Sequence, residues 1–547
     1  MAGRVLAGVL AVAWVASVYA AVAPAQPPAA PLQSPHPADL FQTAETCMVC
    51  HNNLVTPSGD HVSFGSDWRA TMMANSARDP YWQASVRREI IDHPESQAEI
   101  EDECSICHMP MSTFAARAAG GDGEIFAHLP IGEADGPASA LAADGVSCAI
   151  CHQIRPDRLG TPESFTGGYV IDTARRDGER EIFGPFPVDR GRTTLMRSAT
   201  GFVPTEASHL RTSEPCATCH TLYTTALGPK GQTIGRLPEQ MPYLEWRHSA
   251  YRDRQTCQAC HMPAVPEPVP VAGVLGQPRE GVRRHVFRGG NFFMLRMLNR
   301  FRDELGVVAT PQELEQSIAR TVDHLQSASA RLEMDAPRRT AGQLAFDVTV
   351  RNLAGHKLPS AYPSRRVWLH VRVSDASGRL LFESGAVDAS GRIAGNDNDA
   401  DPARFEPHYP RIDRPDQVQI YESIMAGPDG RPTTGLLAGL RYVKDNRLLP
   451  DGFEKSTAPA DVAVHGEATA DADFTAAGDR VSYAVDVGAA SAPLRVEAQL
   501  VFQPIGFRWA DNLRSYDAVE TRRFVRYRDA MASASSLVLA TATIEVP

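Results

Sequence analysis

The feature that most constrains this chain is the pattern Cys-x-x-Cys-His, which occurs five times and uses all ten cysteines. The cysteines are Cys47, Cys50, Cys104, Cys107, Cys148, Cys151, Cys216, Cys219, Cys257 and Cys260, and the histidines are His51, His108, His152, His220 and His261. In the c-type haem attachment pattern, two thiols add to the haem vinyl groups and the adjoining histidine is the proximal iron ligand. The sequence therefore predicts five haem c groups, one at each motif.

Other roles for Cys-x-x-Cys pairs explain the pattern less well. A zinc site needs four ligands from paired knuckles, which leaves one of five motifs over and gives no role to the histidine. A thioredoxin-like dithiol usually occurs once, at the start of a helix after a strand. Zinc, a redox dithiol and disulfides stay as alternatives to haem.

The beginning of the chain predicts export, which thiol attachment of haem requires. Arg4 precedes an apolar stretch from Val5 to Ala23, so we expect a signal peptide over residues 1–25 and a Pro/Ala-rich linker over 26–40. Because the apolar stretch approaches membrane-spanning length, an uncleaved anchor is the alternative. The predicted location is the periplasm or the cell surface, with membrane contact only if the segment stays uncleaved.

Charge indicates which partners to expect. The polypeptide carries a formal net charge of -11, and haem propionates would add further negative charge. Nucleic acid is therefore excluded as a partner. Electron donor and acceptor proteins are the expected partners, although the sequence identifies neither of them.

Patterning divides the rest of the chain into three predicted parts. Residues 41–300 hold all the motifs, at spacings so short that haem must form much of the interior, with short helices and loops around it. Residues 301–335 are a predicted helical connector, since helical spacing extends over 291–333. In residues 336–547 apolar residues alternate with polar ones, which predicts an antiparallel β-sandwich that folds without haem. The fold class is thus multidomain α+β.

The motif surroundings show a family resemblance. The segments Glu103–Met111, Asp144–Gln153 and Thr256–Pro263 resemble multihaem c-type cytochromes related to the tetrahaem cytochrome of ammonia oxidation. The resemblance covers residues 41–300. More distantly, the pentahaem architecture resembles cytochrome c nitrite reductase. The active-site haem of that family usually has Cys-x-x-Cys-Lys, which this chain lacks.

The resemblance implies distal iron ligands. The family pattern Trp-x-x-Ser-x-His corresponds here to Trp68-Arg-Ala-Thr-Met-Met73, so Met73 is a candidate, with Met72 as its competitor and core packing as the alternative role. A second copy at Trp246 offers His248. The segment that begins at His285 resembles the late distal-histidine segment of the family.

Other candidates follow from sequence position. His209 lies shortly before the fourth motif and His128 lies in a loop before the third. His93 and His356 are further candidates. As a ligand, His356 would clamp the β region onto the haem region.

One acidic segment suggests a second cofactor. Asp397, Asp399 and Asp401 alternate beside two asparagines, a pattern that Ca²⁺ can bind through carboxylate oxygens. A solvated acidic loop is the commoner explanation.

Three functions fit these features. The first is electron transfer through five closely packed haems, without catalytic residues. The second is an oxidoreductase in which one haem with an open coordination position acts on a small nitrogen or sulfur oxyanion. The third is a docking protein whose β region binds the partner.

Overall fold

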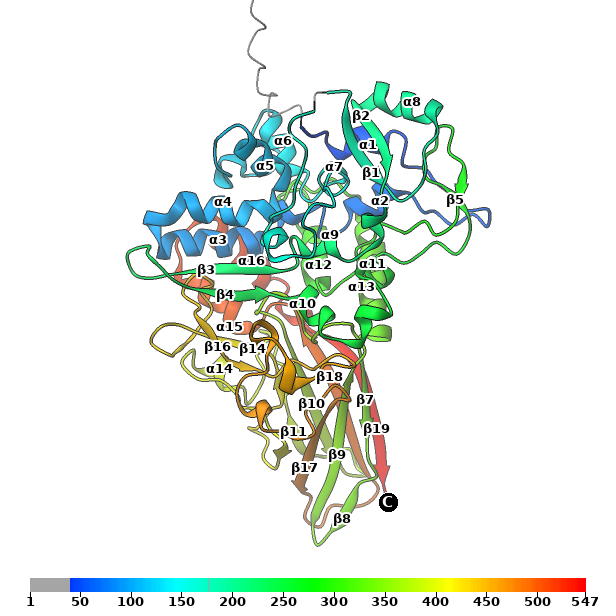
Figure 1. The fold of residues 1–547 in the computed structure, drawn as a ribbon. Coiled ribbons are helices and arrows are strands. Elements are labelled where there is room, and N and C mark those ends of the chain that lie inside the picture. The colour runs from blue at the N-terminus through cyan, green and yellow to red at the C-terminus, as the bar shows by residue number, and fades with distance from the viewer. Residues whose placement is uncertain (1–39, 176) are drawn as a thin grey trace, which may run out of the picture.

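The computed structural model describes residues 40–175 and 177–547, so the predicted signal peptide at 1–25 and nearly all of the predicted linker at 26–40 lie outside the described residues. The predicted mixture of helices and strands is confirmed, with helices gathered toward one end of the molecule and long strands toward the other (Figure 1). Within the described residues, no helix has both the length and the apolarity needed to cross a membrane.

The helix-rich region, residues 40–300, consists mainly of short helices joined by long loops. Its helices are α1 (Ala44–Met48), α2 (Phe64–Arg69), α3 (Pro80–Asp92), α4 (Gln97–His108), α5 (Pro110–Ala118), α6 (Pro137–Ala143), α7 (Cys148–Cys151), α8 (Arg190–Thr200), α9 (Glu214–Ala217), α10 (Pro242–Arg247), α11 (Cys257–His261) and α12 (Phe292–Arg300). Prolines set where several of these helices begin, because a proline in the first turn has no N–H to lose there.

Three small two-stranded sheets also lie in the helix-rich region. They pair β1 (Arg180–Gly184) with β2 (Phe202–Glu206), β3 (Leu222–Leu227) with β4 (Thr233–Gln240), and β5 (Val269–Pro270) with β6 (Pro278–Arg279). They were not predicted, since none shows the sustained alternation of the later strands.

Two five-stranded sheets form the strand-rich region. One has the order β11-β10-β18-β19, with β13 also paired to β10, and the other has the order β12-β17-β9-β7, with β8 also paired to β9. The strands are β7 (Ala330–Met334), β8 (Arg338–Thr340), β9 (Gln343–Asn352), β10 (Arg366–Ser374), β11 (Leu380–Ser384), β12 (Arg411–Ile412), β13 (Ile420–Tyr421), β17 (Asp479–Asp486), β18 (Leu494–Gln503) and β19 (Leu537–Val546). A three-stranded sheet of β14 (Ser423–Ala426), β15 (Pro432–Thr433) and β16 (Arg441–Asp445) lies beside them, and the short helix α14 (Asp397–Ala400) precedes it in the chain.

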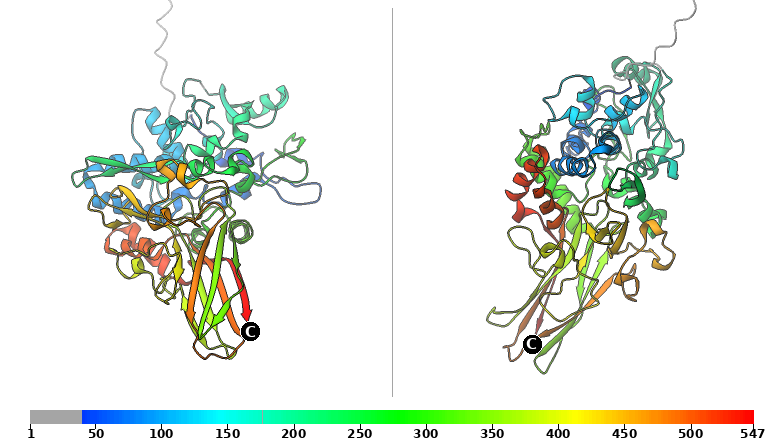
Figure 2. Two further views of the ribbon diagram at one scale, coloured as in Figure 1. Left: turned by 60° about the horizontal axis from the view of Figure 1, so that its bottom comes forward. Right: turned by 90° about the vertical axis from the view of Figure 1, so that its left-hand side faces the viewer.

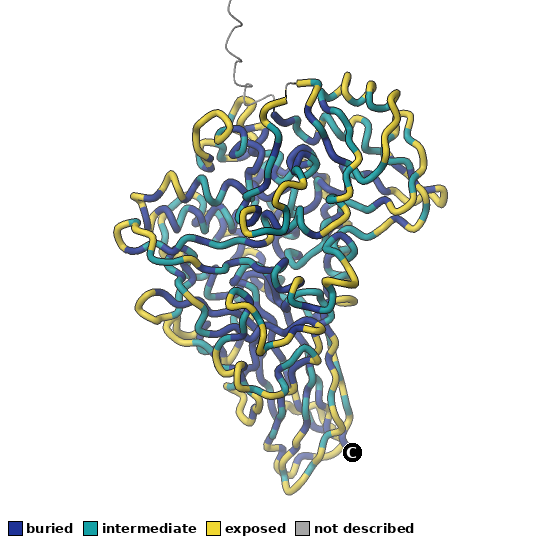
Figure 3. Tube along the Cα trace, viewed as in Figure 1, coloured by how far each residue is buried: buried dark blue, intermediate teal, exposed yellow. Residues whose placement is uncertain are grey.

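The inward faces of the two large sheets share one hydrophobic core. Every second residue of β9 from Leu344 to Val350 is buried, and so is every second residue of β17 from Val481 to Val485. β10 and β18 pair in antiparallel register from Arg366 opposite Gln503 to Ser374 opposite Arg495. The predicted alternating strands are thus confirmed, and exposure is concentrated at loops and sheet tips (Figure 3).

The predicted helical connector extends several residues beyond the point where the helix ends. α12 and α13 (Pro311–Ala328) are helical as expected, and Thr310 and Glu313 form a capping box at the start of α13. The chain then becomes strand β7 at Ala330, inside the predicted helical connector at 301–335. Ala330 and Leu332 are buried, while Arg331 and Glu333 are exposed, which is the period of a strand, and β7 pairs with β9.

The end of the chain returns to the helix-rich region. Helices α15 (Phe507–Asp511) and α16 (Val519–Asp529) follow β18, and α16 lies against α3 (Figures 1 and 2). Arg87 pairs with Glu520 at 3.0 Å, and the rings of Tyr81 and Phe524 have centroids 5.1 Å apart. A single hydrophobic cluster includes Tyr81, α12, α13 and both large sheets. The expected separate unit at 336–547 therefore shares its core with helices outside it.

Candidate haem attachment sites

Each Cys-x-x-Cys-His motif lies on a helical turn. The second motif lies at the end of α4, and the fifth forms α11. In the first, third and fourth motifs, the histidine N–H donates a backbone hydrogen bond of 2.9 to 3.0 Å to the C=O of the first cysteine, as in one turn of an α-helix. Positions i, i+3 and i+4 of a helix share one face. Both thiols and the imidazole of a motif are therefore presented together.

Backbone carbonyls from distant segments hold four of the predicted proximal imidazoles. Nδ1 lies 2.6 to 3.0 Å from a carbonyl oxygen in each case: His51 to Val271, His108 to Ser76, His152 to Phe183 and His261 to Arg288. A carbonyl only accepts, so Nδ1 carries the proton and the lone pair is on Nε2. Such an outer hydrogen bond is typical of metal-ligating histidines.

The motif histidines are incompletely covered by the polypeptide. His108, His152 and His261 are half-buried, and His220 is exposed. Burial lowers the pKa of His108 and of His261 to about 4, and it lowers the pKa of His152 and of His220 as well. These imidazoles are therefore neutral at neutral pH, as ligation of iron requires.

The cysteine side chains fit thioether attachment better than the alternatives. All ten are free of disulfides and half-buried. Among the described residues, the only group of three or more metal-ligating side chains is His408, Asp471 and Asp479, which contains no cysteine, so no knuckle-type zinc cluster forms there. Burial raises the pKa of the Cys151 thiol to about 12 and that of Cys104 well above its usual range, which disfavours metal thiolates at these positions. The residues present fit covalent haem.

Thiols of different motifs are direct neighbours. The thiols of three pairs are close enough to shift the pKa of each other: Cys47 with Cys148, Cys107 with Cys219, and Cys216 with Cys257. Cys219 also lies close enough to Cys151 to raise its pKa. The first motif is therefore close to the third, and the fourth is close to the second and to the fifth.

The ring of His285 lies beside that of His152, the predicted proximal ligand, and nearly parallel to it. The ring centroids are 6.3 Å apart and the planes differ by 13°. An iron held between two imidazole nitrogens, each about 2 Å away, separates the ring centroids by roughly 6 Å. The Nδ1 atom of His285 donates to the carbonyl of Arg283 at 3.1 Å, which leaves Nε2 free. Burial lowers the pKa of His285 to about 4.

A matching pair joins the two regions of the molecule. His356 lies in the β9–β10 loop, residues 353–365, and its ring is 6.2 Å from that of His261 with planes 11° apart. Its Nδ1 atom donates to the carbonyl of Lys357 at 2.9 Å. The loop is held to the helix-rich region, since Glu245 accepts from the Lys357 N–H at 3.1 Å and from the Ser360 hydroxyl at 2.6 Å.

His324 is a candidate that the sequence analysis missed. It lies on α13, and its ring centroid is 6.1 Å from that of His261, with planes 68° apart. Burial lowers the pKa of His324 to about 4, and Arg288 lowers it further. Nothing in its helical, polar surroundings marks it in the sequence, so only the packing of α13 against the fifth motif reveals it.

The other predicted distal ligands are placed less favourably. Nε2 of His209 bonds to the carbonyl of Ile154 at 2.8 Å, and Nε2 of His248 bonds to that of Glu454 at 3.0 Å. Nδ1 of His128 lies 3.0 Å from the Ser139 hydroxyl. Among the described residues, none of these three histidines forms a parallel ring pair with a proximal histidine.

Two candidates have incomplete side-chain contacts. His93 is buried, and its Nδ1 atom has no hydrogen-bond partner among the described residues. Met73 is half-buried, with its carbonyl accepting from the Val146 N–H at 2.9 Å, while the neighbouring Met72 packs against the main core. Core packing therefore accounts for Met72, and Met73 stays a candidate.

The second and fourth motifs have opposite charges around them. Glu89, Glu101, Glu103 and Glu239 all lie near enough to Cys104 to raise its thiol pKa. At the fourth motif, the positive charge of Arg365 lowers the pKa of His220. Because Cys107 and Cys219 are in contact, these two environments are adjacent.

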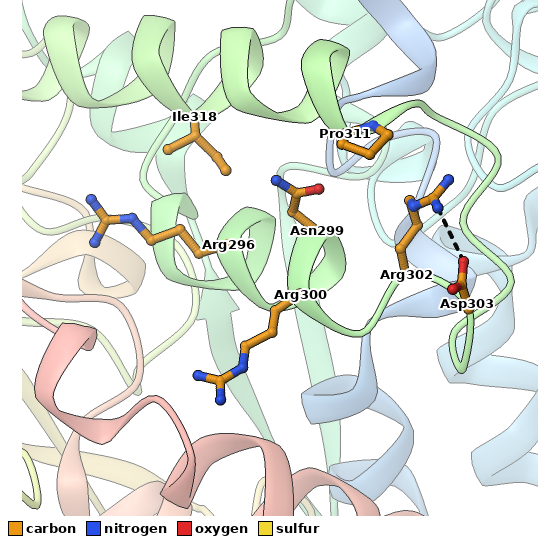
Figure 4. Close-up of a pocket in the computed structure, with 7 residues that line it drawn as sticks. All are labelled: Arg296, Asn299, Arg300, Arg302, Asp303, Pro311 and Ile318. Atoms are coloured by element: carbon orange, nitrogen blue, oxygen red, sulfur yellow. Dashed lines mark ion pairs between the residues drawn. The ribbon is translucent and has the colours of Figure 1, made fainter.

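An open pocket between α12 and α13 is separate from the motifs. It has a volume of ≈ 320 Å³ between α12 and α13, and Figure 4 shows Arg300 pointing away from α13 and Arg302 paired with Asp303. No cysteine or histidine lines it. It is therefore not a haem site.

The acidic segment predicted to bind Ca²⁺ has other partners. Arg366 pairs with Asp399 through two bonds of 2.7 and 2.9 Å, and Arg404 pairs with Asp397. The Asp401 side chain accepts from the Ala403 N–H at 2.9 Å. The three carboxylates are thus used separately, and they form no common cation site among the described residues.

Comparison with known proteins gives one structural match. No protein-family model and no curated protein sequence matches the chain. A penta-heme cytochrome c552 from Thermochromatium tepidum has a similar solved structure, with a TM-score of 0.52, 16% sequence identity, and coverage of 93% of this chain and 99% of that chain. The similarity is one of fold. It extends over both the helix-rich and the strand-rich regions.

Proposed function

We propose that this chain is an exported electron-transfer protein of the multihaem c-type cytochrome kind, with haem c attached at each of its five motifs. The observation that carries the proposal is the pairing of His152 with His285 and of His261 with His356, at 6.3 and 6.2 Å. Two imidazoles on one iron leave no position for a substrate, so such sites pass electrons. The similar fold of a penta-heme cytochrome supports the proposal.

The residues of the chain would set how electrons move. Haem c, when bound, supplies one-electron iron chemistry whose reduction potential depends on ligands, nearby charge and burial. The carbonyls on Nδ1 orient the imidazoles, and the enclosing protein excludes water. Ionised glutamates near Cys104 would favour a lower potential at the second motif, but burial raises the pKa of Glu239 to about 7, so this carboxyl is only partly charged at neutral pH.

Location and partners belong to the same proposal. Covalent attachment of haem, together with the apolar stretch from Val5 to Ala23, supports export to the periplasm or the cell surface. The partners are an electron donor and an electron acceptor protein. Ca²⁺ is not part of the proposal, because the three aspartates of the acidic segment form no common cation site among the described residues.

Intact mass spectrometry and low-temperature electron paramagnetic resonance test the proposal. The denatured holoprotein should exceed the processed polypeptide by the mass of five haems. Low-spin signals of bis-imidazole iron should include the haems at His152 and His261. A fully matured preparation with fewer than five covalent haems contradicts the proposal.

A multihaem oxidoreductase acting on a small nitrogen or sulfur oxyanion is the second candidate. The observation that favours it is that, among the described residues, parallel imidazoles lie beside His152 and His261 but not beside His51, His108 or His220. A single high-spin haem in the resonance spectrum would support this candidate.

A further inference from the structure

Four charged side chains form a buried network beside the β9–β10 loop. Asp445 pairs with Lys357 and with Arg447, at 2.7 Å each, and Arg447 also pairs with Glu245 at 2.9 Å. None of the four side chains is more than 9% exposed. The two positive and two negative charges balance, so the loss of any one leaves an unpaired charge in the interior, which is costly.

Glu245 joins this network to the helix-rich region. It is fully buried on α10, and its Oε2 atom accepts from the Lys357 N–H at 3.1 Å and from the Ser360 hydroxyl at 2.6 Å. Its Oε1 atom faces Arg447. Both oxygens therefore contact residues of the strand-rich region. Hydrogen bonds to a carboxylate are roughly twice as strong as those to a neutral acceptor, so Glu245 holds the loop firmly.

Only two hydrogen bonds separate the Glu245 carboxylate from the His356 imidazole. The Lys357 N–H donates to Glu245, and the Lys357 carbonyl accepts from Nδ1 of His356 at 2.9 Å. With its proton on Nδ1, His356 has its lone pair on Nε2, the atom that would bind iron. The position of Lys357 thus orients the ring whose centroid lies 6.2 Å from that of His261.

Two further side chains of the segment 245–251 hold the same loop. The Ser249 hydroxyl donates to the carbonyl of Gly355 at 3.1 Å, and the Tyr251 hydroxyl donates to that of Leu353 at 2.8 Å. The fifth motif begins shortly after this segment. The part of the chain that leads into the motif therefore also holds the loop that carries the opposite imidazole.

We propose that Glu245 is a positioning residue for the haem at the fifth motif, where it keeps His356, rather than His324, as the second axial ligand. This inference rests on the proposed haem at that motif. The ring of His324 is equally near, at 6.1 Å from that of His261. Among the described residues, however, no hydrogen bond orients the His324 ring, whereas Lys357 and Glu245 hold that of His356.

The test uses full-length holoprotein. Glu245→Gln keeps the size of the side chain and removes its charge. Glu422→Gln is the matched control, because Glu422 also forms a buried ion pair, with Lys444 at 3.0 Å, but has no hydrogen bond or ion pair with the loop among the described residues. Midpoint potentials are measured for all haems. Carbon monoxide binding to the reduced haems is measured too, because carbon monoxide takes the iron position that a released imidazole leaves.

The expected results distinguish positioning from general stability. Glu245→Gln should shift the potential of one haem and strengthen carbon monoxide binding there by about tenfold or more, the weight of one buried hydrogen bond to a charged group. In a His356→Ala background the same change should have no further effect on that haem, because Glu245 acts through His356. Glu422→Gln should match the wild type in both measurements.

Other results overturn the proposal. Unchanged potentials and unchanged carbon monoxide binding in Glu245→Gln do so directly, and so does an effect of equal size in the His356→Ala background. If Glu245→Gln fails to mature, Ser360→Ala decides, because it removes the 2.6 Å bond but keeps all four charges, and wild-type values in this variant overturn the proposal. A wild type without haem at the fifth motif instead removes the proposed function, which mass analysis of the haem peptides distinguishes.

Discussion

The two regions of this molecule fill their interiors differently. In the strand-rich region, alternating side chains such as Leu344, Phe346 and Val371 close a core by themselves. In the helix-rich region, the motif cysteines and His108 are only half-buried, and His220 is exposed. The first interior is complete as polypeptide, whereas the second leaves its motif side chains partly uncovered, as expected where a haem is to pack against them.

This difference indicates that the strand-rich region is stabilised by its own side chains, whereas the helix-rich region would depend on haem. Apolar burial contributes about 25 cal/mol per Å², and a sheet core obtains it from its own residues. Short helices such as α7 and α9 hold one turn each and cannot form alone. Haem would supply the apolar surface that they lack, while the β9–β10 loop brings His356 from the complete region into the incomplete one.

The largest expected effect comes from preventing haem attachment. With every motif cysteine replaced by serine, we expect the helix-rich region to lose cooperative structure, because its interior stays unfilled, while β9, β10, β17 and β18 keep theirs. Hydrogen exchange with mass spectrometry measures both regions in one sample. Equal protection of α4 and β18 in this variant would falsify the contrast.

A second test concerns where the complete region begins. A fragment of residues 336–547 lacks β7 and α13, which bury Leu332, Leu314 and Leu325. Since each buried leucine contributes roughly 2 kcal/mol, we expect this fragment to be less stable than residues 290–547 by at least about 5 kcal/mol. Urea denaturation followed by circular dichroism compares the two fragments. Equal midpoints would restore the boundary that the sequence predicted.

The same elements show which parts of the fold and of the sites could be predicted from the sequence. Alternation over β9, β10, β17 and β18 was visible because one face of each strand is buried along its whole length. β7 was missed because its five residues follow directly on a helix. The motifs specify thiols and proximal histidines at fixed spacing, but a second ligand comes from anywhere in the chain. His356 and His324 approach the same proximal histidine from a loop and from a helix, and only one of them was predicted.

A third test sharpens the link between the regions. If His356 is the ligand opposite His261, His356→Met should raise the potential of one haem, on the order of 0.1 V within the ~0.8 V that axial ligands span. His324→Met is the matched control, because its ring lies at a similar distance from His261. Spectroelectrochemistry measures both variants. A shift in the His324 variant alone would transfer the ligand role to α13.

The smallest expected effect is a pH dependence within the strand-rich region. Burial raises the pKa of Asp479 to about 7 and lowers that of His408 to about 4, and Asp479 accepts from the Tyr421 hydroxyl at 2.6 Å. The oxygens of Gln419 and Asn446 accept from backbone N–H groups, so their amide nitrogens donate to Nδ1 of His408 at 2.8 and 3.1 Å. The His408 proton is therefore on Nε2, which faces Asp471 at 3.1 Å, and this tautomer disfavours a metal.

The two groups act on stability with opposite sign. The raised pKa of Asp479 gives stability that is present below its ordinary value of 3.8 and is lost as pH rises through 7. The lowered pKa of His408 gives stability that is present above 6.5 and is lost as pH falls through 4. Between pH 4 and 6.5 the two contributions offset each other.

Relative to wild type, Asp479→Asn should therefore gain stability with rising pH in this window, by up to about 1.4 kcal/mol per pH unit. His408→Asn should lose stability over the same range, and thermal unfolding of holoprotein across it measures both slopes. Parallel curves for the two variants would show that neither group titrates inside the folded sheets.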